Sequence, residues 1–301
     1  MRVLLLLAPL LLVDLQPGRH AVGLRVSEQT DPSRSRAMQV TVWYPARRGG
    51  TAMRFRDVLA LDSTNAGYES FLQSTGIPTP AVKKWLDAKL LSKRNAPPAD
   101  GRFPLVLIAQ GNRHTAADQA ILAEYIASHG YVVATVPSAM NISGPMKSES
   151  EIGAKAEEQA LDLEFLADVM RNDASADAAK IAVIGHSFGA RAGLLYAMRN
   201  PAVAALVSLD GGIGVAAGRE QLERSTFFRK EALRAHVAHL YEENDEFMKP
   251  DLAMLNEVAK NVYTRKLTSM HHAHFSSAGF AAASLPDVAR ITRAGAGIRD
   301  D

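Results

Sequence analysis

Short apolar runs and longer amphipathic segments alternate regularly along the chain from about residue 102 onward. Apolar runs of four to eight residues bounded by Gly or Pro predict buried strands, and segments with helical spacing predict helices. The predicted strands are 103–109, 131–136, 181–184, 203–209, 236–241 and 261–267, and the predicted helices are 115–129, 149–171 and 190–199. Strands that alternate with helices form a mostly parallel central sheet covered on both faces, so the pattern predicts an α/β fold.

The first hundred residues depart from this rhythm. Residues 19–46 read as an edge region of β structure, in which residues 37–44 alternate and stop at Pro45. Residues 51–100 contain helix-like pieces at 55–61 and 81–91, broken by Gly and Pro. We expect a helical insertion there, either covering a site or lying on the surface, within one domain that spans 18–301.

The N-terminus, residues 1–17, reads as a signal peptide or N-terminal hydrophobic segment. Met1 and Arg2 precede an apolar run at 3–13, which is too short to span a bilayer comfortably. Since no Ala-x-Ala pattern precedes Asp14, the cleavage signal is weak. The segment favours a secreted or periplasmic protein without a stable membrane span. An uncleaved anchor and a cytoplasmic protein are the alternatives.

The amino-acid composition indicates a globular protein and excludes several kinds of binding partner and chemistry. The chain has 301 residues and 47% apolar residues, enough for a substantial core. Its net charge of +2 and the lack of a Lys/Arg-rich block argue against dedicated nucleic-acid binding. The lack of cysteine excludes disulfides, thiolate catalysis and cysteine metal sites. Composition leaves the oligomeric state open.

Candidate chemistry centres on the pentapeptide Gly185-His-Ser-Phe-Gly189, which lies between a predicted strand and a predicted helix. In that context the pentapeptide predicts a nucleophile elbow, in which Ser187 sits in strained backbone at a sharp turn. Gly185 and Gly189 allow strand and helix to pass closely. The helix N-terminus adds positive potential where an oxyanion would form.

An elbow serine needs a base and an acid that orients the base. The cluster Met270-His-His-Ala-His-Phe275 offers His271, His272 and His274, among which we favour His272; a metal site and surface histidines are the alternatives. Asp210 ends one predicted strand, and Asp245 follows the next. The usual order of elbow, acid and histidine favours Asp245, although either aspartate could simply belong to a turn.

An oxyanion hole needs two backbone N–H groups, one after the nucleophile and one from a loop that follows an earlier strand. Phe188 follows the predicted nucleophile. The loop after the strand 103–109 begins Gln110-Gly111-Asn112, where Gly111 permits a tight turn. We therefore expect the amides of Phe188 and Asn112 to be the donors.

From about Gly18 to Phe280 the chain resembles the platelet-activating factor acetylhydrolase-like branch of the α/β-hydrolases, close to dienelactone-hydrolase-like proteins. The matching pieces occur in order: 18–23, Val42-Trp-Tyr-Pro45, Gln110-Gly111, 128–133, 185–189, Ser208-Leu-Asp-Gly211 and His272-Ala-His-Phe275. The resemblance implies the α/β-hydrolase fold, Asp210 rather than Asp245 as the acid, and His272 as the base. The chain departs from the branch in having Gln110-Gly111 where His-Gly is usual.

Together these features predict a serine hydrolase that cleaves a small-molecule carboxylic ester through an acyl-enzyme, with Ser187, Asp210 and His272 as the triad. Neither a cofactor nor a metal is expected. Two alternatives stay open: the same residues acting on an amide or polyester, and a catalytically silent binding protein with a hydrolase fold.

Overall fold

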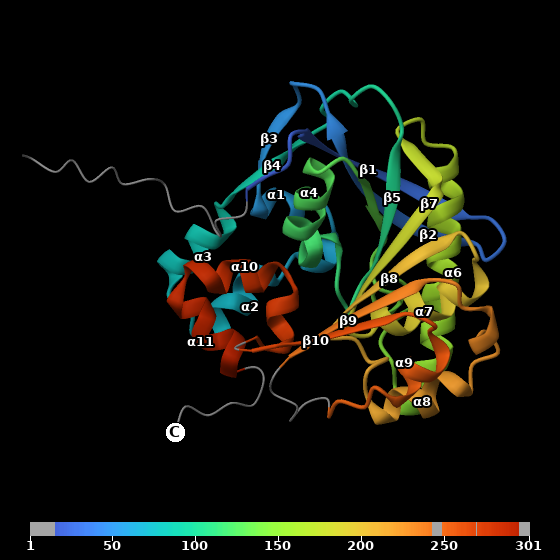
Figure 1. The fold of residues 1–301 in the computed structure, drawn as a ribbon. Helices are drawn as coiled ribbons and strands as arrows, with labels where there is room; N and C mark the ends of the chain where they lie inside the picture. Colours follow the sequence, from blue (N-terminus) through green and yellow to red (C-terminus); the bar gives the residue numbers. More distant parts are fainter. Residues whose placement is uncertain (1–15, 243–248, 269, 295–301) are drawn as a thin grey trace, which may run out of the picture.

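A ten-stranded mixed sheet is the framework of the molecule (Figure 1). The computed structural model describes residues 16–242, 249–268 and 270–294. The sheet has the order β10-β9-β8-β7-β5-β6-β2-β1-β4-β3, and the six strands from β10 to β6 in that order run parallel. The strands are β1 Ala21–Asp31, β2 Arg36–Ala46, β3 Thr51–Arg54, β4 Lys89–Arg94, β5 Phe103–Ala109, β6 Val132–Thr135, β7 Ala176–His186, β8 Val203–Leu209, β9 His236–Glu242 and β10 Val262–Leu267.

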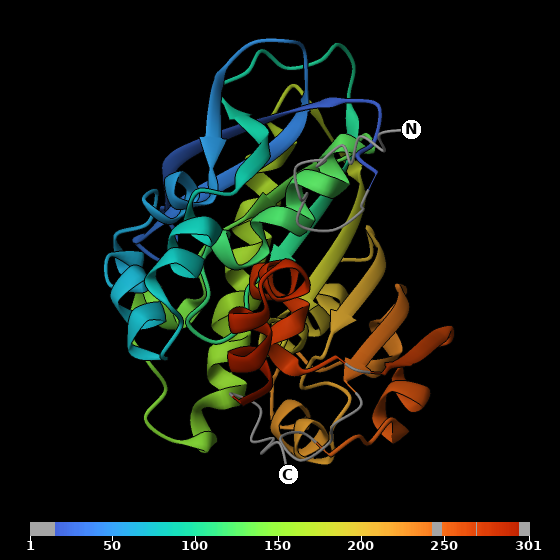
Figure 2. The ribbon, with the colours of Figure 1, turned by 90° about the vertical axis from the view of Figure 1, so that its left-hand side faces the viewer.

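Helices cover both faces of this sheet. The α-helices are α1 Phe55–Leu59, α2 Tyr68–Ser74, α3 Thr79–Leu86, α4 Ala120–Ser128, α5 Ala139–Ser143, α6 Ile152–Arg171, α7 Gly189–Arg199, α8 Ala216–Glu223, α9 Ala253–Val258, α10 Ser277–Ser284 and α11 Pro286–Ala294. Figure 2 looks onto the face that carries α1–α4, α10 and α11, and helices α5–α9 cover the opposite face.

Two apolar cores result, one on each side of the sheet. Along β5, Leu105 and Leu107 enter the core under α6 and α7, whereas Val106 and Ile108 enter the core under α4. This alternation follows from the two-residue period of a strand. Because both faces are buried, the strand reads as a continuous apolar run rather than an alternating one.

The first hundred residues differ from the sequence-based expectation. β1 and β2 form an antiparallel hairpin, and β2 pairs with β6, so β2 lies inside the sheet rather than at its edge. The segment 51–100 is not wholly helical, since β3 and β4 extend the sheet beyond β1. The predicted helix 81–91 ends at Leu86, after which Leu90 packs on the core beside α4 and Ser92 is fully buried.

The later elements follow the predicted rhythm with shifted boundaries. β8 and β5 have the predicted bounds, whereas β7 starts five residues earlier than the run 181–184. The predicted export segment lies in residues 1–15, outside the described residues. Within the described ranges, no helix is both long enough and apolar enough to cross a membrane.

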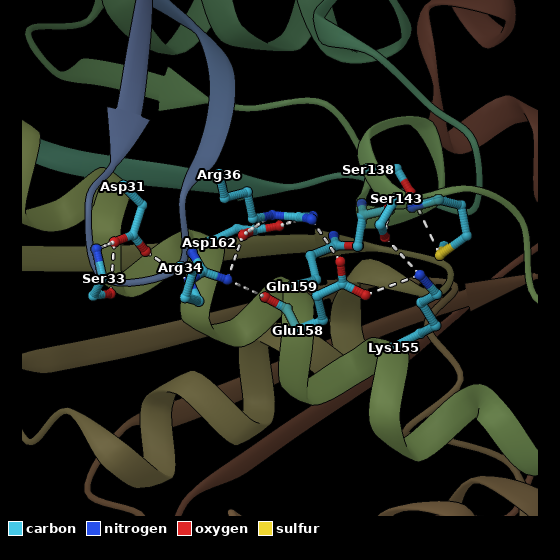
Figure 3. Close-up of polar contacts among 12 residues, drawn as sticks. Asp31, Ser33, Arg34, Arg36, Ser138, Ser143, Lys155, Glu158, Gln159 and Asp162 are labelled. Atoms are coloured by element: carbon cyan, nitrogen blue, oxygen red, sulfur yellow. Dashed lines mark hydrogen bonds and ion pairs between the residues drawn. The ribbon is translucent and has the colours of Figure 1, made fainter.

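A buried ionic network joins the β1–β2 hairpin to helix α6 (Figure 3). The Asp162 side chain is fully buried, and its two carboxylate oxygens accept hydrogen bonds from Arg36 at 2.8 and 2.9 Å. Arg34 approaches the same carboxylate at 2.8 Å and also donates to Asp31. Arg36 further contacts Glu158 at 2.6 Å. Because burial raises the pKa of Asp162, the carboxylate depends on these two guanidinium groups.

We predict that Arg36→Met destabilises the protein by about 3–5 kcal/mol, because a buried carboxylate then loses its bidentate partner. The double variant Arg36→Met/Asp162→Leu is expected to recover much of this loss. Arg224→Met, which breaks the exposed pair with Glu220, is the control and is expected to cost less than about 1 kcal/mol. Urea denaturation measures all three, and equal losses for Arg36→Met and Arg224→Met would contradict the argument.

A second buried carboxylate, Glu124 of α4, lies under the β4 edge of the sheet. Its Oε2 atom accepts hydrogen bonds from the backbone N–H and the hydroxyl of Ser92, both at 3.0 Å. The residue is only 4% exposed. Burial raises its pKa to about 7, against an ordinary value of 4.5, in spite of these two donors.

This shift predicts a pH-dependent stability. Between pH 4.5 and 7 the unfolded chain loses the Glu124 proton while the folded protein keeps it, so the stability contributed by this group falls as the pH rises. The loss between pH 5 and 8 is on the order of 3 kcal/mol. Glu124→Gln removes it, so the variant is expected to gain stability relative to the wild type as the pH rises. Urea melts at pH 5, 6.5 and 8 test this, and parallel pH profiles would disprove it.

Candidate active site

Ser187 occupies the turn between β7 and α7, where the backbone is strained. Its φ is +53°, in the left-handed region that L-residues rarely adopt. Two hydrogen bonds hold this turn against the end of β8: the Ser187 N–H donates to the Leu209 carbonyl at 3.0 Å, and the Gly212 N–H donates to the Ser187 carbonyl at 3.2 Å. The turn is therefore fixed to the neighbouring strand rather than free in solvent.

The two glycines of the pentapeptide are required by close packing. A Cβ atom on Gly189 would lie 2.0 Å from the Ala109 carbonyl oxygen of β5, and one on Gly185 would lie 2.5 Å from the Cα of Ala190. No side chain fits at these distances. The sequence argument for small residues two positions before and after Ser187 therefore matches the packing.

His272 lies in the 3₁₀ turn His272–Phe275, which follows β10, and connects Ser187 to Asp210. Its Nε2 atom is 2.9 Å from the Ser187 hydroxyl, and its Nδ1 atom is 2.5 Å from Asp210 Oδ2. Because a carboxylate only accepts hydrogen bonds, the short contact with Asp210 favours the tautomer of His272 that carries its N–H on Nδ1. In this tautomer Nε2 is the acceptor for the serine proton. The geometry is that of a nucleophile, a base and an orienting acid.

Asp210 follows β8 directly and is 3% exposed. Its φ is +45°, a second strained position beside Ser187. The backbone holds the carboxylate in place, because Asp210 Oδ1 accepts from the Glu242 N–H at 3.0 Å and the Asp210 N–H donates to the Leu240 carbonyl at 2.7 Å. Asp245, the alternative acid, lies outside the described residues.

The other two histidines of the cluster shape the turn that carries His272. The His271 N–H donates to His274 Nδ1 at 2.9 Å, and the His274 N–H donates to the His271 carbonyl at 2.8 Å. This reciprocal pairing resembles a helix N-cap, in which a side chain three residues on satisfies the backbone of the capping residue. Among the described residues, no group of three or more His, Asp or Glu side chains could hold a metal ion.

Hydrogen bonds hold the loop after β5 at Gln110, the residue at which the chain departs from the usual His-Gly pattern. The fully buried Gln110 side chain donates to Thr135 at 2.9 Å, and its backbone carbonyl accepts from the Gln159 side chain at 2.8 Å. Asn112 and Phe188 both line the cavity that contains Ser187 and His272. The loop begins at the switch point of the sheet, where β6 and β7 flank β5, and the role of the two amides as oxyanion donors stays a prediction.

Three imidazoles, those of His114, His186 and His272, stack on one another at the site, and the sequence reasoning missed this stacking. The His186 ring stacks on His114 at 5.0 Å and on His272 at 5.1 Å between centroids. Burial, followed by the charges of the other two rings, holds the pKa of His186 well below its ordinary value. His186 is therefore neutral at neutral pH. Its place beside the elbow serine in the pentapeptide was the available signal.

A cavity of about 700 Å³ opens beside the serine. Its walls come from α7, α8 and the segments before α6, and no residue of 51–100 lines it, so that segment does not cover this cavity. The lining residues are Asn112, His114, Met146, Glu149, Ile152, Ser187, Phe188, Arg191, Val215, Ala216, Ala217, Gln221, Lys249 and His272. The sequence analysis predicted four of these as site residues, namely Asn112, Ser187, Phe188 and His272. The others come from segments that are distant in sequence and come together only in the folded chain.

Comparisons with known proteins agree with this fold. The family model for chlorophyllase matches residues 88–236, just under half of the chain. Cutinase 2 of Thermobifida cellulosilytica and cutinase cut1 of Thermobifida fusca are each 32% identical over 119 residues, or 38% of this chain. The match spans 41% of the first cutinase and 34% of the second, well under half of either relative.

A solved structure extends the likeness to most of the chain. The ferulic acid esterase from Streptomyces cinnamoneus superimposes with a TM-score of 0.62, covering 87% of this chain and 78% of that one at 19% identity. At this identity the likeness concerns the fold alone, and it confirms the predicted α/β-hydrolase fold with its mostly parallel sheet. The fold and the sequence matches together place the chain in the α/β-hydrolase superfamily.

Proposed function

We propose that the protein hydrolyses a carboxylic ester through an acyl-enzyme. The observation that carries the proposal is the continuous hydrogen-bonded path from Ser187 through His272 to the buried Asp210, at the wall of a cavity. The names of the similar proteins, two cutinases and a ferulic acid esterase, support ester hydrolysis rather than a binding role.

Each proposed step uses a contact described above. Ser187 Oγ attacks the ester carbonyl while His272 Nε2 accepts its proton. The amides of Asn112 and Phe188 stabilise the tetrahedral oxyanion. His272 then delivers the proton to the leaving alcohol, which leaves an acyl group on Ser187. Water, deprotonated by His272, attacks this acyl-enzyme and releases the carboxylic acid.

Asp210 acts through the base rather than on the substrate. It holds the Nδ1–H tautomer of His272, and its charge stabilises the imidazolium that forms in each half-reaction. The two backbone hydrogen bonds that fix Asp210 hold its carboxylate within hydrogen-bonding distance of the His272 ring. Because the carboxylate is nearly inaccessible, water does not compete for the ring N–H.

Ser187→Ala is expected to lower the rate of p-nitrophenyl butyrate hydrolysis by a factor on the order of 10⁵–10⁶, since nothing replaces the nucleophile. The variant should also stop reacting with a fluorophosphonate probe, and its circular dichroism spectrum should match the wild type. A variant that folds and keeps more than about one hundredth of the activity would rule out Ser187 as the nucleophile.

For the acid, Asp210→Asn is expected to reduce kcat by roughly 10⁴-fold, because the amide no longer selects the productive His272 tautomer. Asp245→Asn serves as the matched comparison and should retain most of the activity. Steady-state kinetics on the same p-nitrophenyl ester measure both variants. If Asp245→Asn proved the more damaging substitution, the acid would have to be reassigned to the later aspartate.

A further inference from the structure

Arg191 places a positive charge in the proposed catalytic cavity. It is the third residue of α7 and stands four residues after Ser187, and it lines the same cavity as Ser187 and His272. The residue is partly buried, and burial lowers the pKa of its guanidinium to about 10. Arg191 thus remains charged at neutral pH in a poorly hydrated position.

This charge has no anionic partner among the described residues, although the guanidinium carbon lies 6.0 Å from the centre of the Phe188 ring. No carboxylate there forms an ion pair with Arg191, and its Nε atom is shielded from solvent without a hydrogen-bond partner. Arg199 on the same helix offers a contrast, because it pairs with Glu164 at 3.0 Å on the surface. The buried Arg36 has two carboxylate partners. An unpaired guanidinium in a shielded position costs free energy unless something else compensates it.

The loop that carries the triad acid makes room for the guanidinium. A Cβ atom on Gly212 would lie 1.9 Å from Arg191 Nη1 and 2.1 Å from Cζ, so no side chain can stand at this position while Arg191 keeps its place. Gly212 also donates its N–H to the Ser187 carbonyl. The guanidinium therefore lies against the same short loop that fixes the elbow.

Two further polar atoms in the cavity wall are buried without a hydrogen-bond partner among the described residues, His114 Nδ1 and the side-chain oxygen of Gln221 in α8, and part of the wall is apolar. Since amide oxygen and nitrogen can be interchanged by rotation, Gln221 can equally offer its NH₂ group. Met146, Ile152 and Val215 supply apolar surface. Glu149 and Lys249, the other charged lining residues, are both exposed.

We infer that Arg191 binds a carboxylate carried by the substrate, so that the preferred substrates are esters that bear a free carboxylate at one end. This inference rests on the proposed ester hydrolysis. The planar guanidinium fork matches a carboxylate with two parallel hydrogen bonds, which a neutral ester cannot form. Arg191 acts as a specificity-determining residue, while the triad performs the bond cleavage.

The test compares two substrates that differ only in charge, mono-p-nitrophenyl adipate and its methyl ester, methyl p-nitrophenyl adipate. The six-carbon diacid is chosen because shorter hemiesters cleave themselves by attack of their own carboxylate. Release of p-nitrophenol reports the same bond in both compounds. The readout is the ratio of the two kcat/KM values within each protein, which is insensitive to the fraction of active enzyme.

We expect the wild type to favour the anionic ester by about tenfold or more, and Arg191→Met to lower this ratio by about 30-fold, since loss of one partner of a shielded charge pair is costly. Arg191→Lys should retain part of the preference. Arg199→Met, the same substitution on the same helix outside the cavity, is the matched control and should leave the ratio unchanged. A wild type that favours the neutral ester, or an unchanged ratio in Arg191→Met, would overturn the inference.

A binding measurement separates this inference from the proposed function. Calorimetric titration of the wild type and of Arg191→Met with adipate requires no catalysis. If neither ester is cleaved, the proposed function fails, and the carboxylate site stands only if adipate binds the wild type and binds Arg191→Met at least about tenfold more weakly. If adipate does not bind the wild type, cavity water alone solvates the guanidinium and the site is excluded.

Discussion

The pair of backbone hydrogen bonds between Ser187 and the end of β8 is the constraint on which the site depends. Ser187 and Asp210 both occupy left-handed backbone, and each follows one of two adjacent parallel strands. The bonds from Ser187 to Leu209 and from Gly212 to Ser187 tie these two turns together. The sheet thus positions Ser187 and Asp210, the proposed nucleophile and acid, relative to each other independently of His272. Strain of this kind persists only where the surrounding structure enforces it.

Two basic side chains near the site differ in their charge at neutral pH: His186 is neutral and Arg191 is charged. His186, whose ring stacks on His272, is desolvated enough to be neutral at neutral pH, so the imidazolium that the proposed mechanism forms on His272 would have no charged His186 ring beside it. Burial also lowers the pKa of Arg191, which lines the cavity, but the guanidinium keeps its charge because its ordinary pKa is far higher. The same physical effect therefore removes the charge of His186 but is too small to remove that of Arg191.

Local sequence patterns predicted much of the fold and the candidate triad residues. They failed for elements whose structure depends on pairing with distant parts of the chain. The run Val203–Leu209 and the elbow could be predicted because strand length, glycine spacing and helix periodicity are local signals. β4 was missed because Lys89–Arg94 is short and mostly polar, and only its pairing with β1 and β3 makes it a strand. Arg191 and Gln221 could not be found from the sequence, since the absence of a partner is a property of the folded chain.

The ionic network around Asp162 joins parts of the chain that the family model does not match together. The region with detectable family similarity, residues 88–236, contains Asp162 and Glu158 but neither Arg34 nor Arg36. It also retains β6 without its partner β2. A fragment cut at the limits of similarity would therefore carry a buried carboxylate without its cations and an open sheet edge that invites association. The segment that the family model matches is therefore smaller than the unit that these contacts hold together.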